Sequence, residues 1–290
     1  MKINKIKREK NGQYTLLFED GTKVKTYDDV ILKHKLIYDT NVDDKSLEII
    51  NDETRYYDEY TKIVKLIANK LRSEYEIKVY MNKLDMPLPD RLSIIEKLKD
   101  NDLINDLTYA KAYANDKFYL SNFGPLKIKR DLDSNCINPE YIAFALQTIP
   151  MEDVYDHIYK FIDKKIKTNK KDSTYVLKEK IINNLIENGY AKDDIISELN
   201  KFTFKSDDVI AKEYERIKNK LSKHYDGGGL ESETVKKLYL RGFSHDEIAS
   251  FLEKIKVWIN SYFYYIVNQR KTCYTFNSRG IDRWIEKALH

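Results

Sequence analysis

The sequence is poor in cysteine and has no long hydrophobic run. Its two cysteines, Cys136 and Cys273, lie far apart and form neither a CxxC pair nor a Cys–His spacing, so neither a disulfide framework nor a zinc site is indicated. No apolar stretch approaches the roughly 20 residues that a membrane span needs. The opening MKINKIKREKNGQ lacks the apolar core of a signal peptide. We therefore expect a cytoplasmic protein without a membrane partner.

Patterns typical of catalytic sites are also missing. The five histidines are scattered, and none stands beside a carboxylate and a nucleophile in a recognisable arrangement. The stretch DGGGLESETVKK has neither the Lys-Ser or Lys-Thr of a phosphate loop nor GxGxxG spacing, so Gly227 to Gly229 are interpreted as a hinge between repeats. The sequence thus indicates no enzyme, no cofactor and no metal site.

Charge, by contrast, is abundant and unevenly placed. The 290 residues are 34% charged and 42% hydrophobic, which allows a buried core, and the net charge of +4 is too small to indicate nucleic acid by itself. Residues 160–180 carry eight lysines against three acidic residues, and residues 39–59 carry eight acidic against two basic residues. We expect an electrically polar molecule. The lysine-rich segment is either a solvated linker or a basic surface, and the acidic segment a solvated linker or a patch that faces a partner.

The first 26 residues carry strand signals, and the rest of the chain has helical periodicity. The runs KINKIK, YTLLF and VKTY have strand character, and Asp20-Gly21 between two of them predicts a hairpin with a type I′ turn. DDVILKHKLI follows as a short helix. Residues 1–55 are therefore predicted to form a β-hairpin plus a short helix, ahead of a mainly α fold.

A 53-residue repeat organises the helical part. This shift superposes four sets of apolar residues, and the surrounding text repeats an apolar anchor, a turn with Asn or Gly, an acidic helix start, and then Ile and Leu four apart. Glycines 189 and 242 are predicted to end a helix in the left-handed conformation, and Asp193 and Asp246 to offset the dipole of the next helix. The sets are Leu132, Leu185 and Leu238; Ile137, Tyr190 and Phe243; Ile142, Ile195 and Ile248; and Leu146, Leu199 and Leu252.

One such unit buries too little to stand alone, since each anchor contributes only about 1.5 to 3 kcal/mol. The units are therefore expected to stack as tandem three-helix-type repeats in an elongated, curved body. The predicted boundaries are repeat 1 at 56–122, repeat 2 at 123–174, repeat 3 at 175–227 and a partial repeat at 228–256. Residues 257–290 form an aromatic-rich tail, interpreted either as an extra helix on the last repeat or as an extension of unknown role.

The segment FGPLKIKRDL starts a basic helix abruptly. Pro125 is favourable in a first helical turn, and Gly124 lets the chain enter it tightly. Ile128 is expected to point to the core, which places Lys127 and Arg130 on an exposed side.

Several motifs in order resemble the RecX family of regulators of the RecA recombinase. LRSEYEIKVYMNKL is similar to the family's opening helix, NDLINDLTYAKAY to its Gly-Tyr-Leu-Asp-Asp followed by Phe-Ala, and GPLKIKRDL to its Gly-Pro-x-x-Ile-x-x-Leu. The NGYAKDDI repeat follows, and the resemblance covers about residues 60 to 256. The family often has a basic residue where Phe123 stands and another aromatic residue where Tyr109 stands.

The resemblance implies a monomeric, non-catalytic protein that binds RecA filaments, contacts single- or double-stranded DNA through them, and inhibits recombinase and ATPase activity in recombination and repair. Such contacts are salt-sensitive when they involve phosphates. The residues predicted to contribute are the basic ones of the GPLKIKRDL helix, their repeat equivalent, the lysine-rich segment and one upstream arginine: Lys127, Lys129, Arg130, Lys180, Lys164, Lys165, Lys167 and Arg72.

Two other interpretations stay open. RGFSHDEIASFLEKI also looks like the start of a helix-turn-helix, which would make the protein a reader of duplex sequence. A helical-repeat scaffold without nucleic-acid contact is the second alternative. A preferred duplex footprint would favour the former, and partner binding that survives nuclease treatment the latter.

Overall fold

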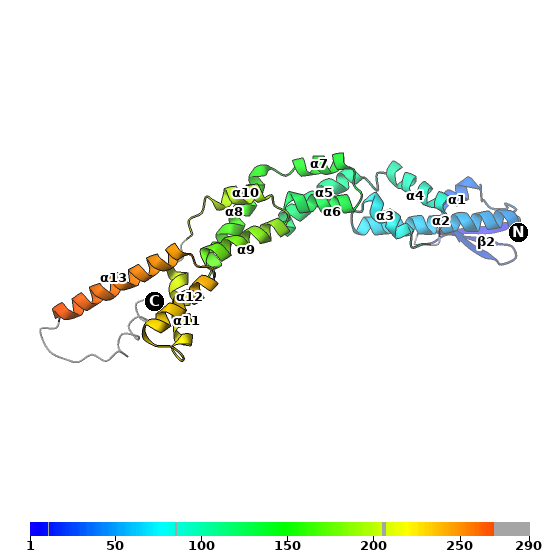
Figure 1. The fold of residues 1–290 in the computed structure, drawn as a ribbon. Helices are drawn as coiled ribbons and strands as arrows, with labels where there is room; N and C mark the ends of the chain where they lie inside the picture. Colours follow the sequence, from blue (N-terminus) through cyan, green and yellow to red (C-terminus); the bar gives the residue numbers. More distant parts are fainter. Residues whose placement is uncertain (11, 85, 205–206, 270–290) are drawn as a thin grey trace. The chain divides into compact units, whose positions relative to one another are not determined.

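The computed structural model describes residues 1–10, 12–84, 86–204 and 207–269, the side chains of 262–269 excepted. As predicted, the fold is mainly α with a small N-terminal antiparallel sheet (Figure 1). Met1–Val154 with Asn188–Tyr190 form one compact unit, and Tyr155–Glu187 with the chain from Ala191 onward form a second. The repeat-by-repeat domain boundaries stay a prediction.

The N-terminal sheet has three strands in the order β1-β2-β3: β1 (Ile3–Arg8), β2 (Tyr14–Phe18) and β3 (Lys23–Thr26). The predicted type I′ turn is wrong, because Gly21 alone among the four loop residues takes a positive φ, of 85°. The loop is instead closed by the Gly21 N–H, which donates to the Phe18 carbonyl at 3.0 Å. The Phe18 N–H also donates to the Thr22 carbonyl at 2.9 Å, so three residues separate these partners, one more than in a two-residue turn, with glycine at the left-handed position.

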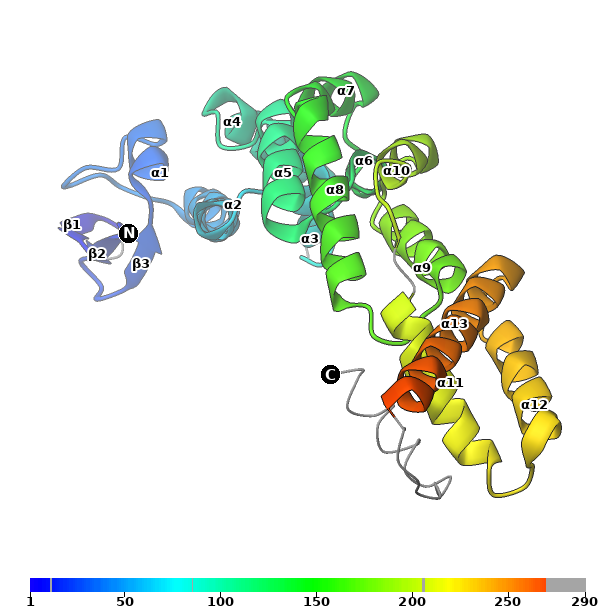
Figure 2. The ribbon, with the colours of Figure 1, turned by 90° about the vertical axis from the view of Figure 1, so that its left-hand side faces the viewer.

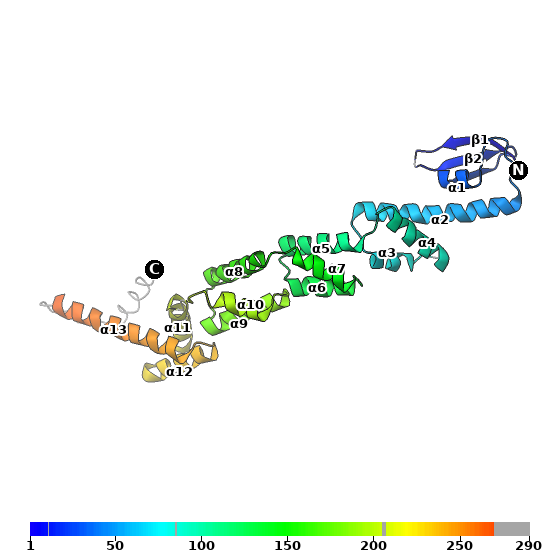
Figure 3. The ribbon, with the colours of Figure 1, turned by 90° about the horizontal axis from the view of Figure 1, so that it is seen from above.

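Two helices cover one face of the sheet: α1 (Asp28–Lys33) and the long α2 (Asp44–Asn69). Figure 3 shows the sheet on one side of α2. Leu16, Phe18 and Ile50 are fully buried between sheet and helix, and burial of each side chain stabilises the fold by about 1.5 to 3 kcal/mol.

The acidic segment 39–59 is therefore mostly helix and not a solvated linker. Its carboxylates have partners within the fold: Glu53 pairs with Lys33 at 2.6 Å and His34 at 2.8 Å, while Asp58 accepts a hydrogen bond from Tyr27 at 2.7 Å.

Three further helices complete the part of the first unit that precedes the superposed repeat: α3 (Glu74–Met81), α4 (Leu88–Asp100) and α5 (Asp106–Ser121). Ser73 and Glu76 form a reciprocal capping box at the start of α3, which satisfies two N–H groups that would otherwise lack partners. Ile77, Ile94 and Leu98 are fully buried in the core that α3 and α4 share with α2.

The 53-residue repeat corresponds to three helix–turn–helix pairs: α6 (Pro125–Ser134) with α7 (Pro139–Gln147), α9 (Thr174–Glu187) with α10 (Lys192–Leu199), and α12 (Gly227–Leu240) with α13 (His245–Gln269). The predicted left-handed caps are confirmed at Gly189 (φ 88°) and Gly242 (φ 82°), and Cys136 takes the same role with φ 54°. The anchors Leu132, Leu185 and Leu238 are all buried.

The second and third sets behave alike, and all of their residues are buried: Ile137, Tyr190 and Phe243, and Ile142, Ile195 and Ile248. The fourth set does not, because Leu199 is buried while Leu146 and Leu252 are only partly buried. The helix-turn-helix candidate is the third of these pairs. Its turn is closed by a hydrogen bond from the Phe243 N–H to the Leu238 carbonyl at 3.2 Å. The equivalent bond in the first pair runs from the Ile137 N–H to the Leu132 carbonyl, also at 3.2 Å.

Helices α8 (Met151–Thr168) and α11 (Asp207–Leu221) follow the first two pairs along the chain. Figure 2 shows α11, α12 and α13 side by side, and their shared core includes Ile210, Tyr214, Leu238 and Phe251. Gly227 to Gly229 form the first turn of α12, so the predicted hinge is wrong.

The tail residues 257–269 continue α13 without a break, so they do not form a separate helix. Val257 and Ile259 are exposed there, and residues 270–290 lie outside the described part of the chain. Among the helices that the structure describes, none is both long and apolar enough to cross a membrane.

Candidate functional site

The start of α6 is fixed by backbone contacts with the α9–α10 turn. The Gly124 N–H donates to the Asn188 carbonyl at 2.7 Å, and the Leu126 N–H donates to the Gly189 carbonyl at 3.0 Å. A Cβ at Gly124 would lie 2.4 Å from the Gly189 carbonyl oxygen, and a Cβ at Gly189 would lie 2.4 Å from Lys127. The abrupt Gly-Pro start therefore serves a close approach of two backbones, with two N–H groups of the first helical turn bonded to carbonyls.

The basic residues of α6 differ in exposure. Lys129 and Arg130 are exposed, as expected, and Ile128 is fully buried. Lys127, expected on the exposed side, is only half-exposed because its Nζ lies 3.7 Å from the centre of the Phe123 ring and its backbone meets Gly189. It is therefore a positioning residue at the α6 entry as well as a cation.

Phe123 is the centre of a small basic–aromatic cluster that the sequence did not single out. Lys117 approaches the same ring, with its Nζ 5.4 Å from the ring centres of both Phe123 and Tyr113. Cation–π contacts of this kind contribute about 0.5 to 1 kcal/mol at exposed sites. The departure from the RecX pattern at position 123 is thus a ring that holds two lysines, and Lys117 joins the candidate surface.

The Arg72 side chain belongs to a hydrogen-bond network inside the fold and does not lie free on the surface. Its Nη1 donates to Glu76 at 3.1 Å, while its Nε is buried without a hydrogen-bond partner among the described residues. Burial and the Glu76 carboxylate raise the pKa of Tyr109 to about 12, and the Tyr109 ring stacks on Tyr113 at 5.9 Å. Glu76 of α3 is therefore shared by Arg72 and by Tyr109 of α5, which joins the opening helix motif to the aromatic motif.

The remaining predicted residues lie in the second unit. Lys167 pairs with Asp163 and Lys180 with Asp172, each at 2.7 Å, so part of the lysine excess of residues 160–180 is neutralised. Lys164 is exposed, and Lys165 is half-exposed with its Nζ 5.2 Å from the Phe161 ring centre. Lys180 and Lys127 are equivalent in the repeat, but their surroundings differ, since Lys127 packs on an aromatic ring and Lys180 on a carboxylate.

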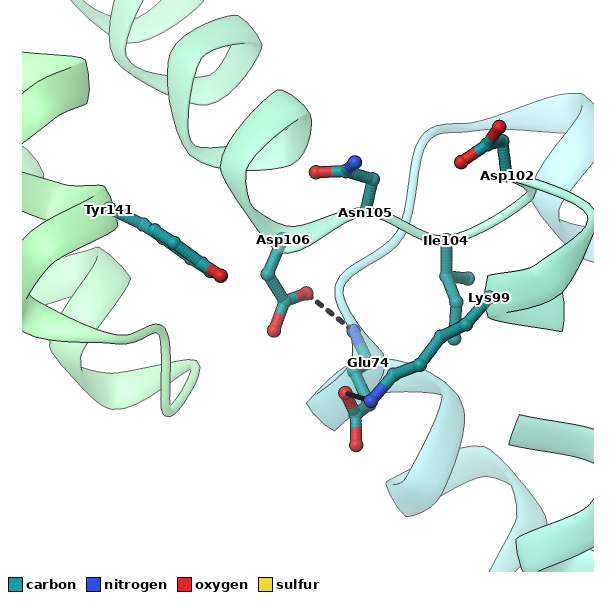
Figure 4. A pocket seen from close by; sticks show the side chains of 7 residues that line it. All are labelled: Glu74, Lys99, Asp102, Ile104, Asn105, Asp106 and Tyr141. Atoms are coloured by element: carbon teal, nitrogen blue, oxygen red, sulfur yellow. Dashed lines mark hydrogen bonds and ion pairs between the residues drawn. The ribbon is translucent and has the colours of Figure 1, made fainter. Parts of the chain in front are cut away.

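A cavity of about 320 Å³ lies in the first unit between the starts of α3 and α5. Figure 4 shows Lys99 reaching Glu74 and the Asp106 carboxylate reaching the Glu74 backbone N–H, at 2.7 and 2.8 Å respectively. Asp106 thus caps α3 from the neighbouring helix. The other lining residues are Asp102, Ile104, Asn105 and Tyr141.

The residues that line this cavity fix the starts of two helices. Among the described residues, no group of His, Cys, Asp and Glu is arranged to hold a metal ion. The Asn105 side chain accepts the Thr108 N–H at 3.0 Å and so caps α5, while Asp106 caps α3. The Asn-Asp pair within NDLINDLTYAKAY therefore fixes two helix starts at once.

Asp106 gives a prediction with an unusual sign. Burial, with the nearby Glu74 charge, raises the pKa of Asp106 above its ordinary value. The Asp106 carboxylate therefore binds a proton more readily in the folded protein than in the unfolded chain. As the pH falls through the raised pKa, protonation of Asp106 increases the free energy of unfolding. We expect Asp106→Asn, which keeps an oxygen for the Glu74 N–H, to be as stable as the wild type or more stable at neutral pH.

The matched change Asp106→Ala leaves the Glu74 N–H without its partner and is expected to cost about 1 to 3 kcal/mol. Chemical denaturation of both variants across acidic to neutral pH measures the difference. An Asn variant that is as unstable as the Ala variant would show that the charge itself holds the joint.

No protein-family model matches the chain. The chain is similar to known proteins named regulatory protein RecX, being 26% identical over 264 residues to that of Listeria monocytogenes serotype 4a, with 89% of this chain and 98% of the relative covered. It is 29% identical over 243 residues to that of Lactococcus lactis subsp. lactis, with 81% and 90% covered.

A solved structure supports the fold. The crystal structure of a regulatory protein RecX matches with a TM-score of 0.59 at 21% identity, over 69% of this chain and 98% of that one. The similarity in sequence spans almost the full length of these two relatives. The chain belongs to the RecX family of regulatory proteins.

Proposed function

We propose that this protein binds RecA filaments on DNA and inhibits filament growth and ATP hydrolysis. The observation that supports the proposal is the sequence similarity to RecX proteins over nearly the whole length of these relatives, which are named as regulatory proteins. The exposed cations of α6 and α8 supply side chains suited to phosphates and to acidic protein surfaces.

Within the proposed interface, exposure separates two kinds of residue. Lys129, Arg130 and Lys164 are exposed, and no carboxylate partner is found for them among the described residues. These three are the candidates for direct contact. Lys127 and Arg72 hold the entries of α6 and α3, so their replacement would disturb the fold together with the interface.

The test adds the purified protein to the cognate recombinase on single-stranded DNA and follows ATP hydrolysis and filament length. We expect stoichiometric protein to reduce both. The variant Lys129→Glu with Arg130→Glu and Lys164→Glu is expected to need about tenfold more protein for half-inhibition, equivalent to about 1.4 kcal/mol of binding free energy.

A matched control replaces three exposed lysines of α11 and the following turn, Lys212, Lys220 and Lys223, with glutamate, which changes the net charge equally. It is expected to inhibit like the wild type. Equal loss in both variants would mean that overall charge and not a located surface drives binding. Unchanged hydrolysis and filament length with the wild type would reject the proposed function.

A further inference from the structure

The N-terminal sheet has two unlike faces, which the strand register defines. Ile6, Leu16 and Val24 are opposite one another on adjacent strands and face α1 and α2. Side chains alternate along a strand, so the residues on either side of Ile6, Leu16 and Val24 point to the opposite face of the sheet. Helices α1 and α2 do not cover this opposite face. This outer face is defined by Lys5, Lys7, Thr15, Leu17, Lys23 and Lys25.

Four lysines frame the outer face. The register places Lys5, Leu17 and Lys23 in one row across the sheet and Lys7, Thr15 and Lys25 in the next. All four lysines are exposed. Lysines on one strand stand about 7 Å apart, and those on β1 and β3 about 9 to 10 Å apart, because the middle strand separates them.

The positive charge of this face is largely uncompensated. Lys7 lies 3.4 Å from Glu9, whereas no ion pair is found for Lys5, Lys23 or Lys25 among the described residues. Glu53, on α2, has partners on the covered side of the sheet. The clustered lysines therefore repel one another, and only the charge of Lys7 is offset by an ion pair among the described residues.

The residue types on the outer face indicate which class of partner it can bind. Lysine is depleted in protein–protein interfaces, and Leu17 is the only apolar side chain among the six, so a protein partner would find little to bury. No aromatic ring is present on which a base could stack, which argues against single-stranded nucleic acid. Flexible ammonium groups spaced in two rows suit phosphates.

We propose that the outer face of the N-terminal sheet, through Lys5, Lys7, Lys23 and Lys25, binds the phosphate backbone of duplex DNA. The contact is independent of sequence, since the face presents no group suited to bidentate recognition of a base edge. It is separate from the cations of α6 and α8 and requires no recombinase, so it goes beyond the proposed function.

Glu9 places a carboxylate beside Lys7 and Thr15 of this face and supplies a test of opposite sign. The Thr15 hydroxyl donates to it at 3.1 Å, and this bond, with Lys7 and Lys25 nearby, lowers the pKa of Glu9, which keeps it charged at neutral pH. Its negative charge opposes a phosphate at the same place. Glu9→Gln is therefore expected to bind duplex DNA more tightly than the wild type.

The experiment measures binding of the full chain to a short mixed-sequence duplex by fluorescence anisotropy at several salt concentrations, without recombinase. Each phosphate contact contributes about −0.9 to the slope of log affinity against log salt. We expect replacement of the four lysines by glutamine to make the slope shallower by about 3 to 4. A variant in which the same four lysines are replaced by arginine is expected to keep the wild-type slope.

The matched control replaces four exposed lysines of the second unit by glutamine, Lys212, Lys220, Lys223 and Lys237, with the same change in net charge. Its slope is expected to shift by less than about 1. Circular dichroism and thermal unfolding establish that each variant is folded, and threonine replacements, which suit strands, take the place of glutamine where it is not.

Three results would overturn the inference. The first is a folded four-lysine variant whose salt dependence of DNA binding is unchanged. If that variant also aggregates more readily, the role of the lysines is to protect the edge strands from pairing and not to bind DNA. The second is equal loss in the control. The third is weaker binding by Glu9→Gln. Recombinase inhibition tests the filament proposal separately, so either proposal can fail while the other stands.

Discussion

Replacing Gly124 with alanine is expected to destabilise the first unit by about 3 kcal/mol or more. The added methyl group would lie 2.4 Å from the Gly189 carbonyl oxygen, and its three nearest neighbours are all backbone atoms, which cannot rotate away. Overpacking typically costs about 1 to 3 kcal/mol. Separation of the two backbones would also break the bonds from the Gly124 and Leu126 N–H groups, and each buried group left unpaired costs about 1 to 3 kcal/mol.

The measurement is hydrogen exchange followed by mass spectrometry of peptides around residues 124–128, because a chain with two compact units need not unfold in one step. Faster exchange is expected there and around Gly189. The control Gly228→Ala adds a methyl in the first turn of α12 where nothing lies within 4 Å, and it is expected to be neutral or stabilising.

Gly189→Ala tests the same contact from the other side, with the added strain of a side chain at φ 88°. Because both changes separate one pair of backbones, the double variant is expected to lose less than the sum of the single losses. Fully additive losses would contradict a shared contact.

The repeat is the part of the fold that sequence reasoning predicted best. Leucine anchors and left-handed turns depend on residues only a few positions apart, and a fixed 53-residue shift displays them three times. Gly124 shows the limit of this approach. Its neighbour Pro125 explains locally why a helix starts there. Position 124 needs glycine because the backbone of Gly189 lies against it, and Gly189 is more than one repeat away in the sequence.

The candidate surface was predicted less completely, because exposure depends on contacts between distant residues. Lys127 follows the helical pattern of an exposed residue, yet Phe123 and the α9–α10 turn cover part of it. The lysines of the N-terminal sheet were missed for a related reason. Lys5 and Lys23 become neighbours of Leu17 only through strand register, which was not assigned from the sequence.

Charge density alone misled the interpretation of residues 39–59. Eight acidic residues suggested a solvated segment, but apolar residues at helical spacing bury Ile50 against the sheet. The acids are then on the remaining sides of α2, where Glu53 and Asp58 bond to neighbouring elements. Periodicity therefore outweighs charge in deciding whether such a segment is a helix.

Replacing any one repeat anchor, Leu132, Leu185 or Leu238, with alanine is expected to cost about 2 to 5 kcal/mol. Each side chain is at most 1% exposed, so its loss leaves a cavity that the surrounding helices fill only in part. The three losses should be similar, because the anchors occupy equivalent places beside a left-handed turn. Thermal unfolding and local hydrogen exchange measure them.

Leu240 supplies the matched control, because it lies on the same helix as Leu238 but is 74% exposed. Leu240→Ala is expected to change stability by less than about 0.5 kcal/mol. The anchors also belong to different units: Leu132→Ala should speed exchange first around α6 and α7, and Leu238→Ala first around α12 and α13. A substitution that loosened both regions equally would mean that the two units unfold together, and the repeats would then act as one cooperative structure instead of as locally anchored pairs.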